Sequence, residues 1–169
     1  MPLKVIKSML DEDPERAQAL VELEDRILER ALAGERKRVS AAELRRRYGV
    51  PQEVLDRLAE LEVVTPSSRG YGQSDVEIVE AISRFRAGGY DERIGFTVYD
   101  AARFLEPLRA LARREVELLS EKLVGRFEPD RAAELVEAGI DPLADLIAAM
   151  NSKLLIDELE AHGAGTRLD

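Results

Sequence analysis

The chain has 169 residues, no cysteine and a formal net charge of −9. Its length suits one compact domain or two small ones. The absence of cysteine excludes disulfides and thiolate-bound metals and points to a reducing compartment. No apolar run is long enough to span a membrane, and the N-terminus lacks the apolar core of a signal peptide. We therefore expect a cytoplasmic protein with no membrane partner.

The first half of the chain has strong helix signals. Helix formers dominate and aromatic residues make up only 5% of the chain, which predicts a nearly all-α protein. Residues 3–10 are predicted to form two helical turns. A longer helix is expected to begin at Asp13-Pro14 and to end at Gly34.

Residues 40–61 predict two short helices joined by a tight turn. Ser40 and Glu43 have the spacing of a capping box, which starts the first of them. Residues 48–51 form the turn, and Pro51 suits the first position of the second helix, which should extend to Leu61.

Residues 63–89 predict a small β wing followed by a helix. Residues 63–65 are β-prone, Pro66 ends them, and residues 67–72 are rich in turn formers. Ser74 and Glu77 form a second expected capping box, and Gly88-Gly89 should stop the helix that it starts.

The C-terminal part predicts a helical bundle. A helix should run from about Thr97 to Arg103 or beyond, until Pro107 kinks or interrupts it. A long apolar stripe follows over residues 108–123. A short helix is expected from residue 129 to about 138 and a last long helix from residue 142, with residues 162–165 fraying into a tail.

Residues 38–89 resemble the MerR family of transcription regulators. The segment from Gly49 to Pro66 has the length of the family's second helix and its exit without a gap, and Gly49, Val50, Leu55, Thr65 and Pro66 match. Residues 39–44 are similar to the family's first helix, residues 69–71 to its wing, and residues 84–90 to the exit of its next helix. The resemblance implies a winged helix-turn-helix in segment 38–90, between an N-terminal helical segment (1–37) and a C-terminal dimerisation or effector region (91–169).

The departures from the family pattern fall at expected DNA contacts. Residues 56–58 read Asp-Arg-Leu where the family has Arg-Tyr-Tyr, Gly72 replaces a wing arginine, and the wing is about two residues shorter. Asp56 and Glu53 would meet phosphates with repulsion. The resemblance therefore supports the fold more firmly than it supports DNA reading.

Basic residues gather ahead of the first short helix and within it. The stretch from Arg30 to Arg47 contains seven basic and two acidic residues, which gives a local charge of +5 in an acidic chain. One interpretation is phosphate anchoring and the other is a solvated face paired with Glu35 and Glu43. For DNA binding we single out Lys37, Arg45, Arg46, Arg47, Arg57 and Arg69.

The stripe over residues 108–123 also has two interpretations. The resemblance implies antiparallel pairing with a second copy, and the alternative is an internal helix packed against the last two helices. The dimerisation candidates are Leu108, Leu111, Val116, Leu119 and Leu123. Phe96, Tyr99 and Phe104 could line a pocket for a small-molecule effector, although core packing is the simpler use of these rings.

No catalytic site is predicted. His162 is the only histidine, so neither a nucleophile–base pair nor a nitrogen-ligated metal site can be assembled from histidine and cysteine. We expect no enzyme activity, no metal and no cofactor.

Three functional hypotheses remain. The first is a MerR-like regulator that binds DNA as a homodimer, with residues 51–61 in the major groove. The second is a degenerate MerR-like module that does not read DNA and serves dimerisation, ligand sensing or partner binding, as part of a longer regulator if the native chain extends upstream of Met1. The third is an unrelated helical protein whose turn pattern matches by chance.

Overall fold

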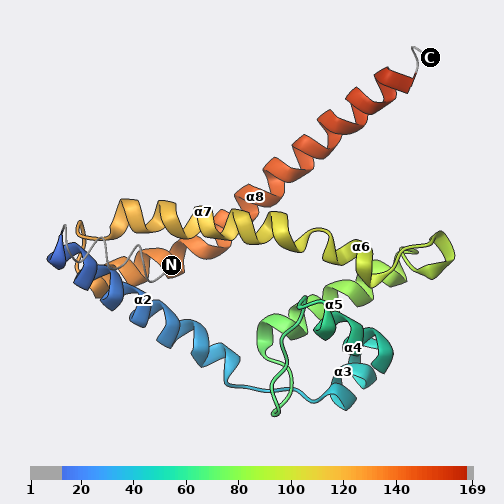
Figure 1. Cartoon of the computed structure of the whole chain (residues 1–169), viewed down its shortest axis with the longest axis horizontal. Helices are drawn as coiled ribbons and strands as arrows, with labels where there is room; N and C mark the ends of the chain where they lie inside the picture. The colour runs from blue at the N-terminus through green and yellow to red at the C-terminus, as the bar shows by residue number, and fades with distance from the viewer. Residues whose placement is uncertain (1–12, 167–169) are drawn as a thin grey trace. The chain divides into compact units, whose positions relative to one another are not determined.

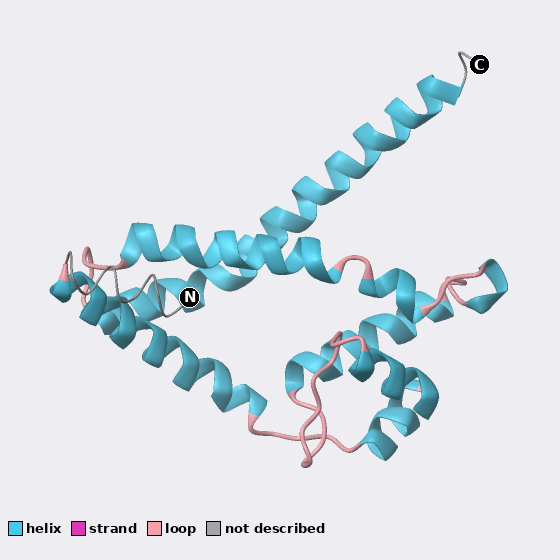
Figure 2. Cartoon of the chain, viewed as in Figure 1, coloured by secondary structure: helices cyan, strands magenta, loops and turns pink. Residues whose placement is uncertain are grey.

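The computed structural model describes residues 13–166, apart from the side chains of residues 30–32, 34 and 166. These residues form helices joined by loops (Figures 1 and 2), which confirms the prediction of a nearly all-α protein. The helix expected over residues 3–10 lies outside the described residues. In chain order the helices are α2 (Pro14–Glu35), α3 (Ala41–Tyr48), α4 (Gln52–Glu60), α5 (Gln73–Ala87), the short 3-10 helix η1 (Glu92–Ile94), α6 (Val98–Ala102), α7 (Leu105–Leu123) and α8 (Pro129–Thr166).

The chain divides into two compact units. The middle unit spans residues 28–121, and the end unit combines the chain before residue 28 with the chain from residue 122 onward. The sequence predicted boundaries after residues 37 and 90, between segments of different expected function. These boundaries stay a prediction.

The core of the middle unit is built by α3, α4 and α5. Ser40 Oγ accepts a hydrogen bond from the backbone N–H of Glu43 at 3.2 Å and caps α3, but the Glu43 carboxylate binds Arg46 and Arg47, so only the Ser40 half of the predicted capping box is present. Gly49 then adopts the left-handed conformation, with a φ of 64°, and turns the chain into α4. The buried residues of this core are Leu44, Val50, Leu55, Leu58, Val64, Tyr71, Val76 and Val79.

The segment between α4 and α5 is a loop with two isolated β-bridges. The strand tendency of residues 63–65 is not realised, because the N–H of Val63 bonds back to the carbonyl of Leu58 at 2.9 Å. The side chain of Val64 is buried in the core instead. Val39 and Tyr71 exchange two backbone hydrogen bonds, at 2.8 and 2.9 Å, and Ser67 pairs with Gly70 across a tight turn.

The core of the end unit joins α2 to the beginning of α8. Leu20 and Leu23 of α2 are buried with Val124, Ala132 and Ala133. At the edge of this core, Arg26 Nη1 and Asp130 Oδ1 are 2.6 Å apart. The helix α2 begins at Pro14 as predicted, with Asp13 Oδ1 accepting from the N–H of Arg16 at 3.1 Å, and ends one residue beyond Gly34.

Two helix starts differ from the prediction. The helix α5 begins at Gln73 with Gly72 at its N-cap, so Ser74 lies inside the first turn and the expected capping box is wrong. The break between α6 and α7 comes at residues 103–104, ahead of Pro107. Pro107 is therefore in the first turn of α7, where the missing N–H removes no helical hydrogen bond.

The last 38 helical residues form one helix rather than two. The sequence predicted a break near Pro142 and fraying from residue 162, but α8 continues through Pro142 to Thr166. Helix formers on both sides sustain it, at the cost of one hydrogen bond at the proline. Within residues 13–166, no helix combines the length and the apolar character needed to cross a membrane.

Candidate functional site

The arginines of α3 are divided between paired and unpaired side chains. Glu43 accepts hydrogen bonds from Arg46 Nε at 3.1 Å and from Arg47 Nε at 2.6 Å. The guanidinium of Arg46, and after it that of Arg47, holds the pKa of the Glu43 carboxyl below its usual value. Arg45 is exposed and no ion pair joins it to a side chain that the structure describes.

Arg57 of α4 is held by two neighbours. Its Nη1 lies 2.6 Å from Glu60 Oε2 on the same helix. Its guanidinium carbon lies 5.7 Å from the centre of the Tyr99 ring, a cation–π contact that ties α4 to α6. An arginine held in this way has to exchange partners before it can bind a phosphate.

The other predicted cations of the middle unit belong to loops on either side of α3. Lys37 lies between α2 and α3, Arg69 lies at the tip of the 67–70 turn, and both are exposed. The pairing of Val39 with Tyr71 brings the two loops together. Gly70 rests on the backbone of Val39, so the turn is held against the entrance to α3.

A second contact fixes the base of this loop. Ser74 donates from its backbone N–H to Glu35 Oε1 at 2.8 Å and also donates from its hydroxyl. These hydrogen bonds, with the nearby charge of Arg38, lower the pKa of the Glu35 carboxyl. Sequence reasoning missed this contact, because Glu35 and Ser74 are 39 residues apart.

The exposed surface of α4 is mainly acidic. Glu53, Asp56 and Glu60 are exposed and Arg57 is the single basic residue of this helix. Asp56 Oδ1 accepts from Gln52 Nε2 at 2.8 Å. A helix with this surface would repel the phosphates on either side of a DNA groove.

The five dimerisation candidates on α7 do not share one environment. Leu123 packs against the core of the end unit. Leu108 lines a cavity in the middle unit. Leu111 and Leu119 are half-buried, and Val116 is exposed. None of the five is buried, and Leu108 and Val116 are more than half exposed, so α7 keeps apolar surface of its own and the pairing predicted for this stripe stays a prediction.

An apolar cavity of about 330 Å³ in the middle unit is lined by residues of α4, α5, α6 and the start of α7. Phe96 and Phe104, both singled out from the sequence, line it, whereas Tyr99 lies under Arg57 instead. Its full lining is Val54, Ile82, Phe85, Arg86, Tyr90, Phe96, Thr97, Val98, Ala101, Phe104 and Leu108. Sequence reasoning missed Phe85 and Tyr90 as lining residues. The signal that could have found them is their position on either side of Gly88-Gly89, where a turn can bring two rings together.

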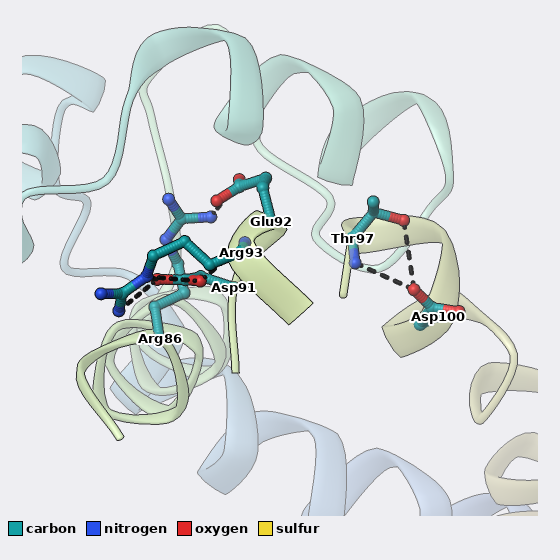
Figure 3. A network of polar contacts seen from close by, with 6 residues as sticks. All are labelled: Arg86, Asp91, Glu92, Arg93, Thr97 and Asp100. Atoms are coloured by element: carbon teal, nitrogen blue, oxygen red, sulfur yellow. Dashed lines mark hydrogen bonds and ion pairs between the residues drawn. The ribbon is translucent and has the colours of Figure 1, made fainter. Parts of the chain in front are cut away.

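Charged groups beside the cavity bond to one another. Figure 3 shows Arg86 of α5 directed at Glu92, with 2.6 Å between Nη1 and Oε1, while Asp91 binds Arg93 at 2.8 Å. These arginines lower the pKa values of the Glu92 and Asp91 carboxyls. At the start of α6, Asp100 Oδ2 accepts from the N–H of Thr97 at 2.9 Å and closes a capping box.

Comparison of the chain with models of known protein families, with curated proteins and with solved structures found no match.

Proposed function

We propose that the middle unit is a MerR-like winged helix-turn-helix module of a transcription regulator that contacts DNA as a homodimer. The supporting observation is the packing of α3, the Gly49 turn, α4 and α5 around one core, with a loop held beside them by Val39 and Tyr71. The wing in this proposal is the short loop over residues 66–72, which replaces a hairpin of full strands.

The distribution of charge supports contact with phosphates rather than with bases. Lys37, Arg45 and Arg69 are exposed and available to bind phosphate oxygens. Arg46, Arg47 and Arg57 contribute only if DNA displaces Glu43 or Glu60 from them. Such contacts position a protein on DNA but carry little sequence information.

The homodimer is proposed to form through α8. The residues from 151 to 165 are all exposed, and from residue 146 onward six large apolar side chains of the helix are more than half exposed. They are Leu146, Met150, Leu154, Leu155, Ile156 and Leu159. A monomer rarely exposes so much apolar surface, and a second copy of the same helix would cover it.

Charge favours an antiparallel pair of α8 helices. Lys153 is the only basic residue of the stretch from 141 to 160, which contains five acids. A crossing near residue 149 places Lys153 beside Asp145 of the partner subunit and Asp141 beside the partner subunit's Asp157, each twice by symmetry, so the attractive contacts offset the repulsive ones. A parallel pair in register would instead align like charges.

A second candidate function is favoured by the acidic surface of α4. In this alternative the module has lost DNA reading and serves dimerisation, ligand sensing or partner binding. Glu53, Asp56 and Glu60 on α4 and the net charge of −9 support it.

Binding of the full chain to a random-sequence DNA duplex at varied salt separates the two candidates. DNA contact predicts an affinity that falls steeply with salt, and the Lys37→Ala, Arg69→Ala double variant should flatten the log–log slope by about two. Arg113→Ala, which removes an exposed charge from α7, is the matched control and should leave the slope unchanged. Failure of the chain to retain DNA at low salt would leave only the second candidate.

A substitution that removes a negative charge tests whether α4 lies against the DNA. Asp56→Asn removes one negative charge from the exposed surface of α4. If α4 lies against the duplex, the affinity at low salt should rise several-fold, because one repulsive contact with phosphate is lost. An unchanged affinity would mean that the DNA lies away from this helix.

A further inference from the structure

The apolar cavity of the middle unit is shaped by four helices and by the loops before α6 and α7. Val54 of α4, Ile82 of α5 and Val98 of α6 contribute aliphatic walls, while Leu108 of α7 lies at its edge. Its volume, about 330 Å³, lies within the range of small-molecule sites in proteins. The polar side chains in the lining are those of Arg86, Thr97 and Tyr90.

Aromatic rings form one side of this cavity. Phe85 and Tyr90 are stacked with 4.4 Å between ring centres and an angle of 11° between their planes. Phe96 meets Phe85 edge to face, at 5.0 Å. These rings keep considerable contact with solvent, since 43% of Phe85 and 49% of Tyr90 are exposed. Exposed rings held in fixed mutual orientation offer stacking and edge contacts to a further planar ring.

The surrounding charges select against a charged occupant. Arg86 is bonded to Glu92, Arg93 to Asp91, and Asp100 to the N-terminus of its own helix (Figure 3). A charged ligand would have to break one of these contacts or lose its hydration without compensation, and both are costly. The cavity therefore fits a molecule without net charge.

We propose that this cavity binds a small, neutral, largely aromatic molecule. This binding goes beyond the proposed contact with DNA and does not depend on it. The molecule stacks on the rings of Phe85, Tyr90 and Phe96 and fills the space next to Ala101. The hydroxyl of Tyr90 supplies a polar contact for an oxygen or nitrogen atom of the ligand.

The cavity also connects to the proposed DNA surface. Val54 comes from α4, and the helix α6, which contributes Val98 and Ala101, also carries the Tyr99 ring under Arg57. A ligand that displaces α6 alters the hold on Arg57. Binding in the cavity would in this way change the position of the Arg57 guanidinium on α4, while its charge stays the same.

Two related dyes test the proposal on the full chain. N-phenyl-naphthylamine is neutral and becomes fluorescent in apolar surroundings, and anilinonaphthalene sulfonate is the same ring system with an added negative charge. The cavity should take up one neutral molecule per chain and bind the sulfonate at least tenfold more weakly. Equal binding of the two dyes would overturn the assignment of a neutral ligand.

Two substitutions locate the bound dye. Ala101→Leu adds bulk inside the cavity and should lower the affinity for the neutral dye at least fivefold while the helical circular dichroism is kept. Leu155→Gln removes apolar surface from α8 and should leave the affinity unchanged. If the Leu155 variant loses the dye and the Ala101 variant retains it, the dye binds α8 and the proposal fails. Because no DNA is present, this outcome is independent of the proposed contact with DNA.

Discussion

At Gly70 the backbone has a φ of 110°, and an added Cβ would meet the carbonyl group of Val39. We predict that Gly70→Ala lowers the free energy of unfolding by about 3 kcal/mol, from strain and from loss of the contact between the two loops. Gly49→Ala is the control, because Gly49 has a φ of 64° with open space around it, and it should cost about 1 kcal/mol. Urea unfolding measures both, and equal losses would show that the loop is not held against Val39.

Glu35 makes stability depend on pH. Its pKa is lowered in the folded protein, so its contribution is present above about pH 4.3, the ordinary value, and is lost as the pH falls through the lowered value. We predict that Glu35→Gln lowers stability at neutral pH and reduces the loss of stability on acidification.

The control for this pH effect is Glu117→Gln, which removes an exposed carboxylate from α7. Chemical unfolding at a series of pH values should give parallel curves for this variant and the wild type. A Glu35 variant whose curve also runs parallel to the wild type would refute the role assigned to the contact with Ser74.

Single-residue features were predictable where they depend on neighbours in sequence. The cap at Ser40 and the turn at Gly49 follow from residue types three or four positions apart. The second hydrogen bond of the predicted capping box, from the backbone N–H of Ser40 to Glu43, is replaced, because the Glu43 carboxylate binds Arg46 and Arg47. The contact of Glu35 with Ser74 could not be predicted, since nothing local brings the two residues together.

Among the helices, α8 contains the most testable irregularity. Pro142 lies in its interior, where its ring removes one hydrogen bond and crowds the carbonyl four residues earlier. We predict that Pro142→Ala raises the free energy of unfolding by about 1–3 kcal/mol. The measurements are thermal unfolding and helical circular dichroism. Pro129→Ala, at the first position of the same helix, is the control and should change stability little.

Helix existence was predictable and strand formation was not. Apolar periodicity located α2, α3, α4 and α5, each of which contributes buried apolar residues to a core, and it also located α7, which has no buried residue. The β-prone residues 63–65 have no neighbouring strand to pair with, and the side chain of Val64 is instead buried in the core between the helices. Propensity also misplaced the end of the helix before Pro142, because a long run of good helix formers outweighs one proline.

At the scale of the whole molecule, self-association distinguishes two surfaces. We predict that Leu155→Asn on α8 converts a dimer to a monomer, because a polar side chain would replace an apolar one that is 58% exposed in the single chain. Val116→Asn on α7, a residue with nearly the same exposure, should leave the dimer intact. Sedimentation equilibrium measures both.

The opposite result, with only the Val116 variant dissociating, would place the dimer contact on α7 and contradict the role of α8. A wild-type chain that is monomeric at every concentration tested would remove the homodimer from the proposal. In that case the apolar residues of α8 would be left for a partner of a different kind.

The division into units could not be predicted, because it depends on contacts distant in sequence. Leu20 and Leu23 of α2 find their partners in Val124 and Ala132, and local periodicity does not identify partners. The candidate site was predictable in part. Phe96 and Phe104 were recognisable as aromatic residues in an apolar context, whereas the stacking of Phe85 on Tyr90 depends on the turn between them.

The placement of α2 and the start of α8 in one core has a consequence for synthesis on the ribosome. The middle core is complete in sequence at Val79, whereas Leu20 and Leu23 must wait until Ala133 has been made. At roughly 5–20 residues per second, the interval lasts several seconds. During it the apolar face of α2 has no partner, and closing so long a loop carries an entropic cost. A nascent chain stalled in this interval would be the form that most needs a chaperone.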